Sequence, residues 1–194
     1  MRRSIGHKKI KTAVFISGKG SNLKNLIKFS KFKKYPFSVN LILSNTKKAK
    51  GLKYSNQYRI EKKIINYDKK IKTDKKILYF LNQKKIKLIC LAGFMKILSK
   101  NFIKKFKGKI INIHPSLLPK YKGLNTHFRA IKNGEKFTGC TVHYVTSKLD
   151  SGKIILQKKI RVFKKDNENS LSKKVLKIEH KLYPKAVKKL LSNL

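Results

Sequence analysis

The stretch T-A-V-F-I-S-G-K-G-S-N, residues 12–22, decides the fold class. Its first six residues, Thr12–Ser17, are mostly apolar and rich in β-formers, which predicts a buried strand that ends at a glycine. Ser21 or Asn22 can then cap a helix that runs to about Phe29. A strand that leads through a glycine turn directly into a helix is the first part of a βαβ unit.

The same alternation continues along the chain. Further strands are predicted at Val39–Leu43, Lys63–Tyr67, Ile86–Ala92 and Lys109–Ile113. Helices are predicted around Gly51–Tyr58, Thr73–Leu81, Ser99–Phe106 and Phe128–Lys132. The last segments are an antiparallel strand pair and a closing helix interrupted or bent at its proline, which are Thr138–Thr146, Lys153–Phe163 and Ser170–Leu191 with Pro184.

These elements predict one α/β domain of Rossmann-like type. It would have a mostly parallel central sheet with helices on both faces and an antiparallel carboxyl-terminal strand pair. The domain is expected to span residues 12–194, after a basic tail over residues 1–11 that is expected to be disordered.

Composition excludes several classes of protein. Of 194 residues, 40% are apolar, which is enough to bury a core, and no apolar run reaches the 18 residues of a membrane span. The basic amino terminus has no apolar segment behind it, which argues against a secretory signal. Cys90 and Cys140 have neither a disulfide-framework nor a metal-site spacing, and they suit a reducing cytoplasm.

The net charge of +43, from 51 Lys+Arg against 8 Asp+Glu, raises the possibility of a nucleic-acid-binding protein. However, only 5 of these cations are Arg, the residue that base readout favours, and the Lys residues are spread along the chain. Abundant Phe, Ile, Lys, Tyr and Asn indicate an AT-rich genome instead. We expect only non-specific attraction of nucleic acid and of anionic substrates.

The segment S-G-K-G-S-N, residues 17–22, could bind an anion. Gly18 and Gly20 let the backbone turn sharply and approach a ligand, and free N–H groups at a helix start favour phosphate. The segment matches neither the dinucleotide fingerprint nor a P-loop. An ordinary strand-to-helix turn explains this segment equally well.

A second candidate site follows the predicted strand Lys109–Ile113. Asn112 and His114 are two positions apart, so on an extended strand end they point the same way, and strand carboxyl ends are where open parallel sheets bind ligands. An amide donor beside an imidazole can polarise a carbonyl. The alternative is a structural histidine in a proline-rich turn.

Asp150 stands in the turn D-S-G between the last two predicted strands. A carboxylate there could orient or charge a nearby imidazole, although Asp also favours turns without any chemistry. His143 fits a structural or supporting role better than a catalytic one. A metal site of His114, His143 and Asp150 is conceivable, but the spacing does not demand one.

Taken together and in order, these segments resemble the phosphoribosylglycinamide formyltransferase family of folate enzymes, from about Ile10 to Leu191. The likeness is carried by the runs F-I-S-G-K-G-S-N-L, L-A-G-F-M-K-I-L-S, I-N-I-H-P-S-L-L-P-K-Y-K-G-L-N-T-H and E-H-K-L-Y-P. Methionyl-tRNA formyltransferases share the Asn-x-His-x-Ser-Leu-Leu-Pro stretch but normally add a carboxyl-terminal domain. Formyltetrahydrofolate deformylases usually have a second His where Pro115 stands.

The resemblance implies formyl transfer from 10-formyltetrahydrofolate to the amine of glycinamide ribonucleotide in purine synthesis, without a metal, in a cytoplasmic monomer or homodimer. The catalytic residues implied are Asn112, His114 and Asp150, with protonated His114 stabilising the oxyanion and Asp150 keeping it charged. The ribonucleotide would be bound by Gly20, Ser21, Asn22 and Glu179. The folate would be bound by Lys70, Met95, Lys96, Ile97, Leu98 and Asn112.

Two residues depart from the family's common pattern. Lys96 stands in place of a frequent Arg, which keeps the charge but changes its geometry. Lys153 stands in place of a frequent Pro after Asp150-Ser151-Gly152 and leaves the shape of that loop open.

Overall fold

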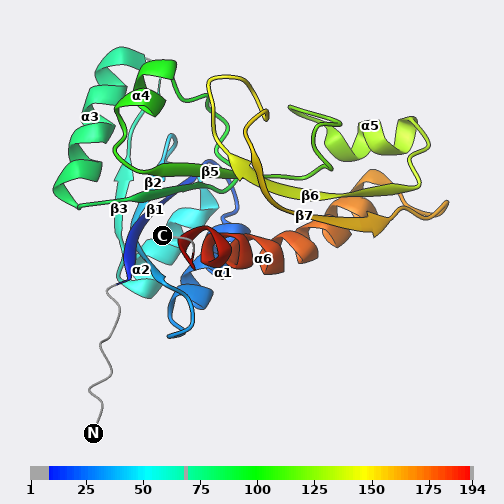
Figure 1. Ribbon diagram of the computed structural model, residues 1–194, viewed down its shortest axis with the longest axis horizontal. Coiled ribbons are helices and arrows are strands. Elements are labelled where there is room, and N and C mark those ends of the chain that lie inside the picture. Colours follow the sequence, from blue (N-terminus) through cyan, green and yellow to red (C-terminus); the bar gives the residue numbers. More distant parts are fainter. Residues whose placement is uncertain (1–8, 68–69, 193–194) are drawn as a thin grey trace, which may run out of the picture.

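The computed structural model, which describes residues 9–67 and 70–192, is built around a seven-stranded sheet (Figure 1). The order of the strands across the sheet is β3-β2-β1-β4-β5-β6-β7. Their bounds are β1 Ile10–Ile16, β2 Phe37–Ser44, β3 Glu61–Ile64, β4 Leu88–Leu91, β5 Lys109–His114, β6 Phe137–Tyr144 and β7 Ile154–Arg161.

Strands β1 to β5 pair in parallel, whereas β6 runs antiparallel to both β5 and β7. The chain fills the sheet on one side of β1 with β2 and β3, then crosses back to place β4 on the other side. This crossing point beside β1 is where open α/β sheets bind their ligands. The predicted mostly parallel sheet with an antiparallel carboxyl-terminal strand pair is confirmed.

Helices cover both faces of the sheet (Figure 1). Their bounds are α1 Ser21–Ser30, α2 Lys53–Tyr58, α3 Lys70–Gln83, α4 Lys100–Lys105, α5 Thr126–Lys132 and α6 Glu168–Ser192, with a 3₁₀ turn η1 at Lys50–Leu52. Val14 and Ile16 of β1 contribute to the core shared with α1 and α6, while Ala13 and Phe15 contribute to the core beneath α3 and α4. This alternation along a strand buried on both faces explains its continuous apolar sequence.

A buried tyrosine connects α6 to the middle of the sheet. The hydroxyl of Tyr183, which is fully buried, shares its one hydrogen between the backbone carbonyls of Leu91 in β4, at 2.9 Å, and Ile111 in β5, at 3.2 Å. Helix α6 continues through Pro184, so of the predicted interruption or bend at this residue, the interruption is wrong. Pro184 is buried on the face that packs against the core.

Three predicted boundaries need correction. Strand β1 begins at Ile10, whose N–H donates to the Pro36 carbonyl, so residues 10 and 11 belong to the sheet rather than to the basic tail; residues 1–8 lie outside the described residues. Strand β3 covers Glu61–Ile64 rather than Lys63–Tyr67, because its register against β2 starts at Glu61. Helix α3 extends further in both directions than Thr73–Leu81.

The start of α1 differs from the prediction as well. Neither Ser21 nor Asn22 caps the helix, because both lie within its first turn. The cap is Gly20, with φ 72° and ψ 27°, and it makes no side-chain cap hydrogen bond. A Cβ at Gly20 would lie 2.7 Å from the Gly51 Cα, so a glycine is required here by both backbone conformation and close packing.

We predict that Gly20→Ala lowers the free energy of unfolding by about 1–3 kcal/mol, because it adds strain at a positive φ and forces the backbone of η1 to shift. Gly18→Ala is the matched control, since a Cβ at Gly18 meets no atom within 4 Å. Urea unfolding of both variants checks this, and equal stabilities would contradict it.

Candidate active site

The predicted functional segments meet at one edge of the sheet. The glycine loop at residues 17–22 follows β1, the segment from Met95 to Leu98 follows β4, and Asn112 and His114 lie at the end of β5. Since β1, β4 and β5 are parallel neighbours, their carboxyl ends lie at the same edge.

The start of α1 offers unpaired backbone donors. Lys24 N–H donates to the Gly20 carbonyl at 2.9 Å, but the N–H groups of residues 21–23 have no acceptor among the described residues. Gly18 anchors the loop by accepting a hydrogen bond from Gly51 N at 2.9 Å. These free donors and the positive end of the helix dipole can hold an anion.

Asn22 and Glu179 form a buried polar pair beside this loop. Asn22 Nδ2 donates to Glu179 Oε2 at 2.6 Å, and both residues are more than 90% buried. Burial raises the pKa of Glu179 to about 7, against the hydrogen bond from Asn22, which lowers it. Asn22 Oδ1 is buried with no partner among the described residues. The sequence suggests that both residues bind the ribonucleotide, but not that they touch each other.

Asp150 lies between the side chains of Asn112, His114 and His143. Its Oδ1 is 3.4 Å from Asn112 Nδ2 and 3.6 Å from His143 Nε2, and its Oδ2 is 3.4 Å from His114 Nδ1. The structure therefore brings together the three predicted catalytic residues, which are 38 positions apart in the chain at the extremes.

The turn around Asp150 fixes the carboxylate. Asp150 has φ 44°, and its Oδ2 accepts a hydrogen bond from Gly123 N at 2.9 Å. A Cβ at Gly152 would lie 1.8 Å from the Tyr144 carbonyl oxygen, so this turn requires glycine. Tyr144 N donates to the Lys153 carbonyl at 3.0 Å, which shows that Lys153 keeps the hairpin closed without the family's common proline.

Asp150 is ionised at neutral pH. Burial raises its pKa, but hydrogen bonds from His143 and Gly123, and the nearby His114 and His143, outweigh this effect and lower the pKa overall. The site therefore holds a buried anion next to imidazole nitrogens.

His114 lies between Asp150 and the Tyr121 carbonyl. Its Nε2 lies 2.8 Å from the Tyr121 carbonyl, so Nε2 carries a hydrogen and Nδ1 faces Asp150. Burial lowers the pKa of His114 below its ordinary value, despite the opposing influence of the Tyr121 carbonyl and Asp150. Burial therefore opposes a charge on His114 while Asp150 favours one, and the expectation that Asp150 keeps His114 charged stays a prediction.

His143 is a site residue whose contacts sequence reasoning missed. Its Nδ1 donates to the Tyr144 carbonyl at 2.8 Å, and its Nε2 lies 3.4 Å from Asn112 Nδ2 and 3.6 Å from Asp150 Oδ1. The register of the strand pair would reveal this contact, because His143 pairs directly with Asn112 across β5 and β6. His143 therefore contacts both Asn112 and Asp150.

The predicted folate-binding residues differ in their exposure to solvent. Met95 and Ile97 are about two-thirds exposed, and Lys96 is exposed between them. Leu98 is 4% exposed and packs in the core beneath α3 and α4, so its side chain is not part of this surface. Lys70 is the first residue of α3, and its side chain lies outside the described part of the chain.

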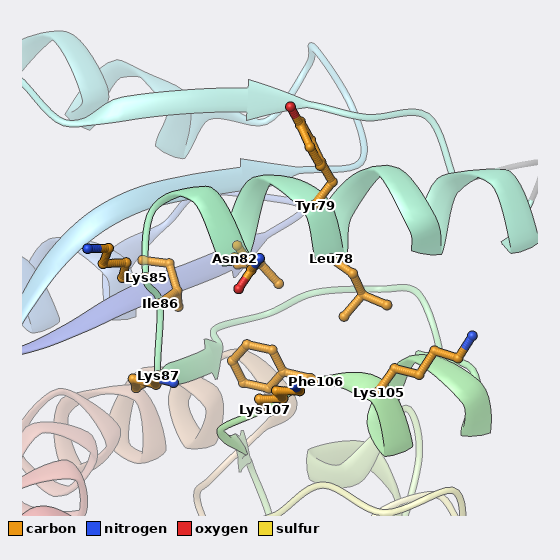
Figure 2. A pocket seen from close by; sticks show the side chains of 10 residues that line it. Leu78, Tyr79, Asn82, Lys85, Ile86, Lys87, Lys105, Phe106 and Lys107 are labelled. Atoms are coloured by element: carbon orange, nitrogen blue, oxygen red, sulfur yellow. The ribbon is translucent and has the colours of Figure 1, made fainter.

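A hollow of about 470 Å³ lies away from this edge, between α3 and α4 (Figure 2). It is lined by residues of α3, by Phe106 just after α4, and by Lys85, Lys87, Lys105 and Lys107. The side chains of Lys85 and Lys105 lie at opposite ends and point away from each other (Figure 2). None of the predicted site residues lines this hollow.

The described residues show neither a metal-binding cluster nor a membrane-spanning helix. No group of three or more His, Cys, Asp or Glu side chains there is arranged to hold a metal ion, including His114, His143 and Asp150. No helix in the same part of the chain is long and apolar enough to cross a membrane.

Comparison with known proteins identifies the family. The sequence matches the formyl transferase family over residues 10–187. The chain belongs to the formyl transferase family. A Haemophilus influenzae phosphoribosylglycinamide formyltransferase is 39% identical over 92% of this chain and 85% of its own. The crystal structure of a Brucella melitensis phosphoribosylglycinamide formyltransferase superposes with a TM-score of 0.88 at 40% identity, over 94% of this chain and 96% of that one.

This formyl transferase also resembles one part of larger proteins. It is 41% identical over 187 residues to the human trifunctional purine biosynthetic protein adenosine-3, covering 95% of this chain but only 18% of that protein. The family resemblance and the fold class predicted from sequence are both confirmed.

The lowered pKa of His114 gives a direct prediction for the formyl transferase in its ligand-free form. We expect the ring proton signals of His114, assigned with a His114→Asn variant, to titrate below pH 6.5 in NMR spectra. Asp150→Asn should lower this pKa further, because a nearby negative charge is lost. A titration above pH 7 in the unmodified protein would contradict the lowered pKa and would show that His114 is charged at neutral pH.

Proposed function

We propose that this enzyme transfers the formyl group of 10-formyltetrahydrofolate to the amine of glycinamide ribonucleotide in purine synthesis. The observation that carries the proposal is the cluster of Asn112, Asp150 and buried His114, which lies between the glycine loop at residues 17–22 and the exposed segment at residues 95–97. The high identity to phosphoribosylglycinamide formyltransferases over most of both chains supports the choice of substrate.

The two substrates would bind on either side of the cluster. The phosphate of the ribonucleotide would lie at the free N–H groups of α1, with Ser21 adding a hydroxyl donor and Glu179 facing the ribose. The pterin of the folate would lie against Met95, Lys96 and Ile97 after β4. These remote contacts position the amine and the formyl carbon, which converts an encounter of two substrates into a reaction within one complex.

The amine attacks the formyl carbon and produces a tetrahedral oxyanion. One Nδ2 hydrogen of Asn112 is held by Asp150 Oδ1, and the other is the amide donor for this oxygen. The charge that develops on the oxygen also raises the affinity of nearby His114 for a proton.

The attacking nitrogen must lose a proton and the leaving nitrogen of tetrahydrofolate must gain one. His114 Nδ1 and Asp150 Oδ2, 3.4 Å apart and both unprotonated, leave room for one proton between them. We assign this pair as the acceptor of the amine proton, which then moves to the leaving nitrogen as the carbon–nitrogen bond breaks. No covalent enzyme intermediate is needed.

A two-substrate assay tests the reaction itself. The purified protein should consume 10-formyltetrahydrofolate only when glycinamide ribonucleotide is present, with formylated ribonucleotide as the product. Transfer to initiator methionyl-tRNA without transfer to the ribonucleotide would favour the tRNA enzyme. Hydrolysis of the formyl donor with no acceptor would favour a deformylase.

We predict that Asn112→Ala lowers kcat about 10²–10³-fold, because an oxyanion donor is lost. Asp150→Asn should lower kcat comparably, since the proton acceptor pair loses its charge. Glu61→Gln is the control, because Glu61 forms only partly exposed ion pairs with Lys63 and Lys84 at the edge strand β3. Activity of either site variant near that of the control would contradict the assigned role.

The net charge of +43 leads to a separate prediction about nucleic-acid binding. We expect weak binding of single-stranded RNA without sequence preference, with log affinity falling by about 0.7 per neutralised phosphate for each unit of log salt concentration. Filter binding at several salt concentrations measures this slope. Tight, sequence-selective binding at physiological salt would instead indicate a second function.

A further inference from the structure

A buried carboxylate lies outside the site described above, on α3. Asp74 is 3% exposed and accepts two side-chain hydrogen bonds. One comes from the Tyr67 hydroxyl, at 3.0 Å, and the other from the Ser99 hydroxyl. Only 8 acidic residues occur in the chain, so a buried one is an unusual use of this residue type.

Ser99 is the residue at which the loop after β4 ends. Its hydroxyl oxygen accepts a hydrogen bond from Phe102 N at 2.9 Å and caps α4, while its hydroxyl hydrogen points to Asp74. The Ser99 hydroxyl therefore acts both as a donor and as an acceptor. These two hydrogen bonds fix the end of the loop relative to α3.

The front of the same loop has an anchor of its own. Met95 N donates to Ser17 Oγ at 2.8 Å, and the Ser17 hydroxyl in turn donates to Asn45 Oδ1. The ring of Phe94 packs edge-on against Phe15 and Tyr67, with centroids 5.4 and 5.8 Å apart. Tyr67 thus touches both the loop and the carboxylate that holds its far end.

Between these anchors stand Met95, Lys96 and Ile97, whose side chains are exposed. The exposed side chains contribute little burial energy of their own, so the hydrogen-bonded ends determine the shape of the segment. Leu98, which packs in the core, supplies the remaining restraint.

The geometry points to Asp74 as a positioning residue that holds the loop after β4 in the conformation that binds the formyl donor. This inference rests on the proposed function, because it takes residues 95–98 as the folate-binding segment. Asp74 acts through Ser99 and does not touch the substrate. Substitution of Asp74 should therefore weaken binding of the folate. The loop at residues 17–22, which is assigned to the ribonucleotide, should keep its shape because it is anchored by the hydrogen bond between Gly18 and Gly51.

The test compares the two substrates in one set of variants. Asp74→Asn keeps the shape of the side chain but removes its charge, and we expect the Kd and KM for 10-formyltetrahydrofolate to rise about tenfold. The KM for glycinamide ribonucleotide should stay within about twofold, as should kcat at saturating folate. Calorimetry with 10-formyltetrahydrofolate measures the Kd without turnover.

Ser99 provides the matched pair of controls. Ser99→Ala should reproduce the folate defect, and Ser99→Thr, which keeps the hydroxyl, should restore near-normal folate binding. If Asp74→Asn does not fold, Tyr67→Phe removes one hydrogen bond to Asp74 and should cause a smaller rise in the folate Kd.

Two results would overturn the inference: equal weakening of both substrates, or a lower melting temperature with an unchanged folate Kd. Either would make Asp74 a structural link between α3 and α4. A wild-type protein that binds no 10-formyltetrahydrofolate would instead overturn the proposed function, and this inference with it.

Discussion

The parallel pairing of β1, β4 and β5 is the constraint on which the site depends. It brings the ends of three strands, separated by up to about 100 residues of sequence, to a single edge of the sheet. The anion-binding loop, the exposed apolar loop and the Asn112–His114 pair then need no further long-range contact to become neighbours. Antiparallel β6 adds His143 opposite Asn112 and leads directly into the turn that carries Asp150.

At this edge, burial and charge act against each other. Burial lowers the pKa of His114, while hydrogen bonds and the nearby histidines lower the pKa of Asp150, so both shifts favour the unprotonated forms of the pair. Such a pair is a better acceptor of a proton than a preformed ion pair would be. The same principle applies at Glu179, where burial raises the pKa to about 7 next to the loop assigned to the phosphate. The site thus contains groups that respond to the charge a substrate brings.

Much of this arrangement could be predicted from sequence, because strands buried on both faces have continuous apolar runs such as residues 13–16. The sequence predicts the edge strand β3 too late in the chain, because its residues, Glu61–Ile64, are mostly charged and only one neighbouring strand defines its register. The helix cap at Gly20 depends on close contact with Gly51, which is far away in sequence. The charge state of His114 and the contacts of His143 could not be predicted either, because both depend on three-dimensional burial and strand register.

The central claim is that both substrates bind at one edge of the sheet, on either side of Asp150. The most direct measurement is the affinity of a stable adduct that links glycinamide ribonucleotide covalently to a folate analogue, compared with the affinity of each half. The account predicts that the adduct binds at least about 10²-fold more tightly than either half, because both loops are engaged by one molecule. Backbone NMR signals of residues 18–23 and 94–98 should shift together. An adduct that binds no better than its folate half, and leaves the signals of residues 18–23 unchanged, would contradict the account.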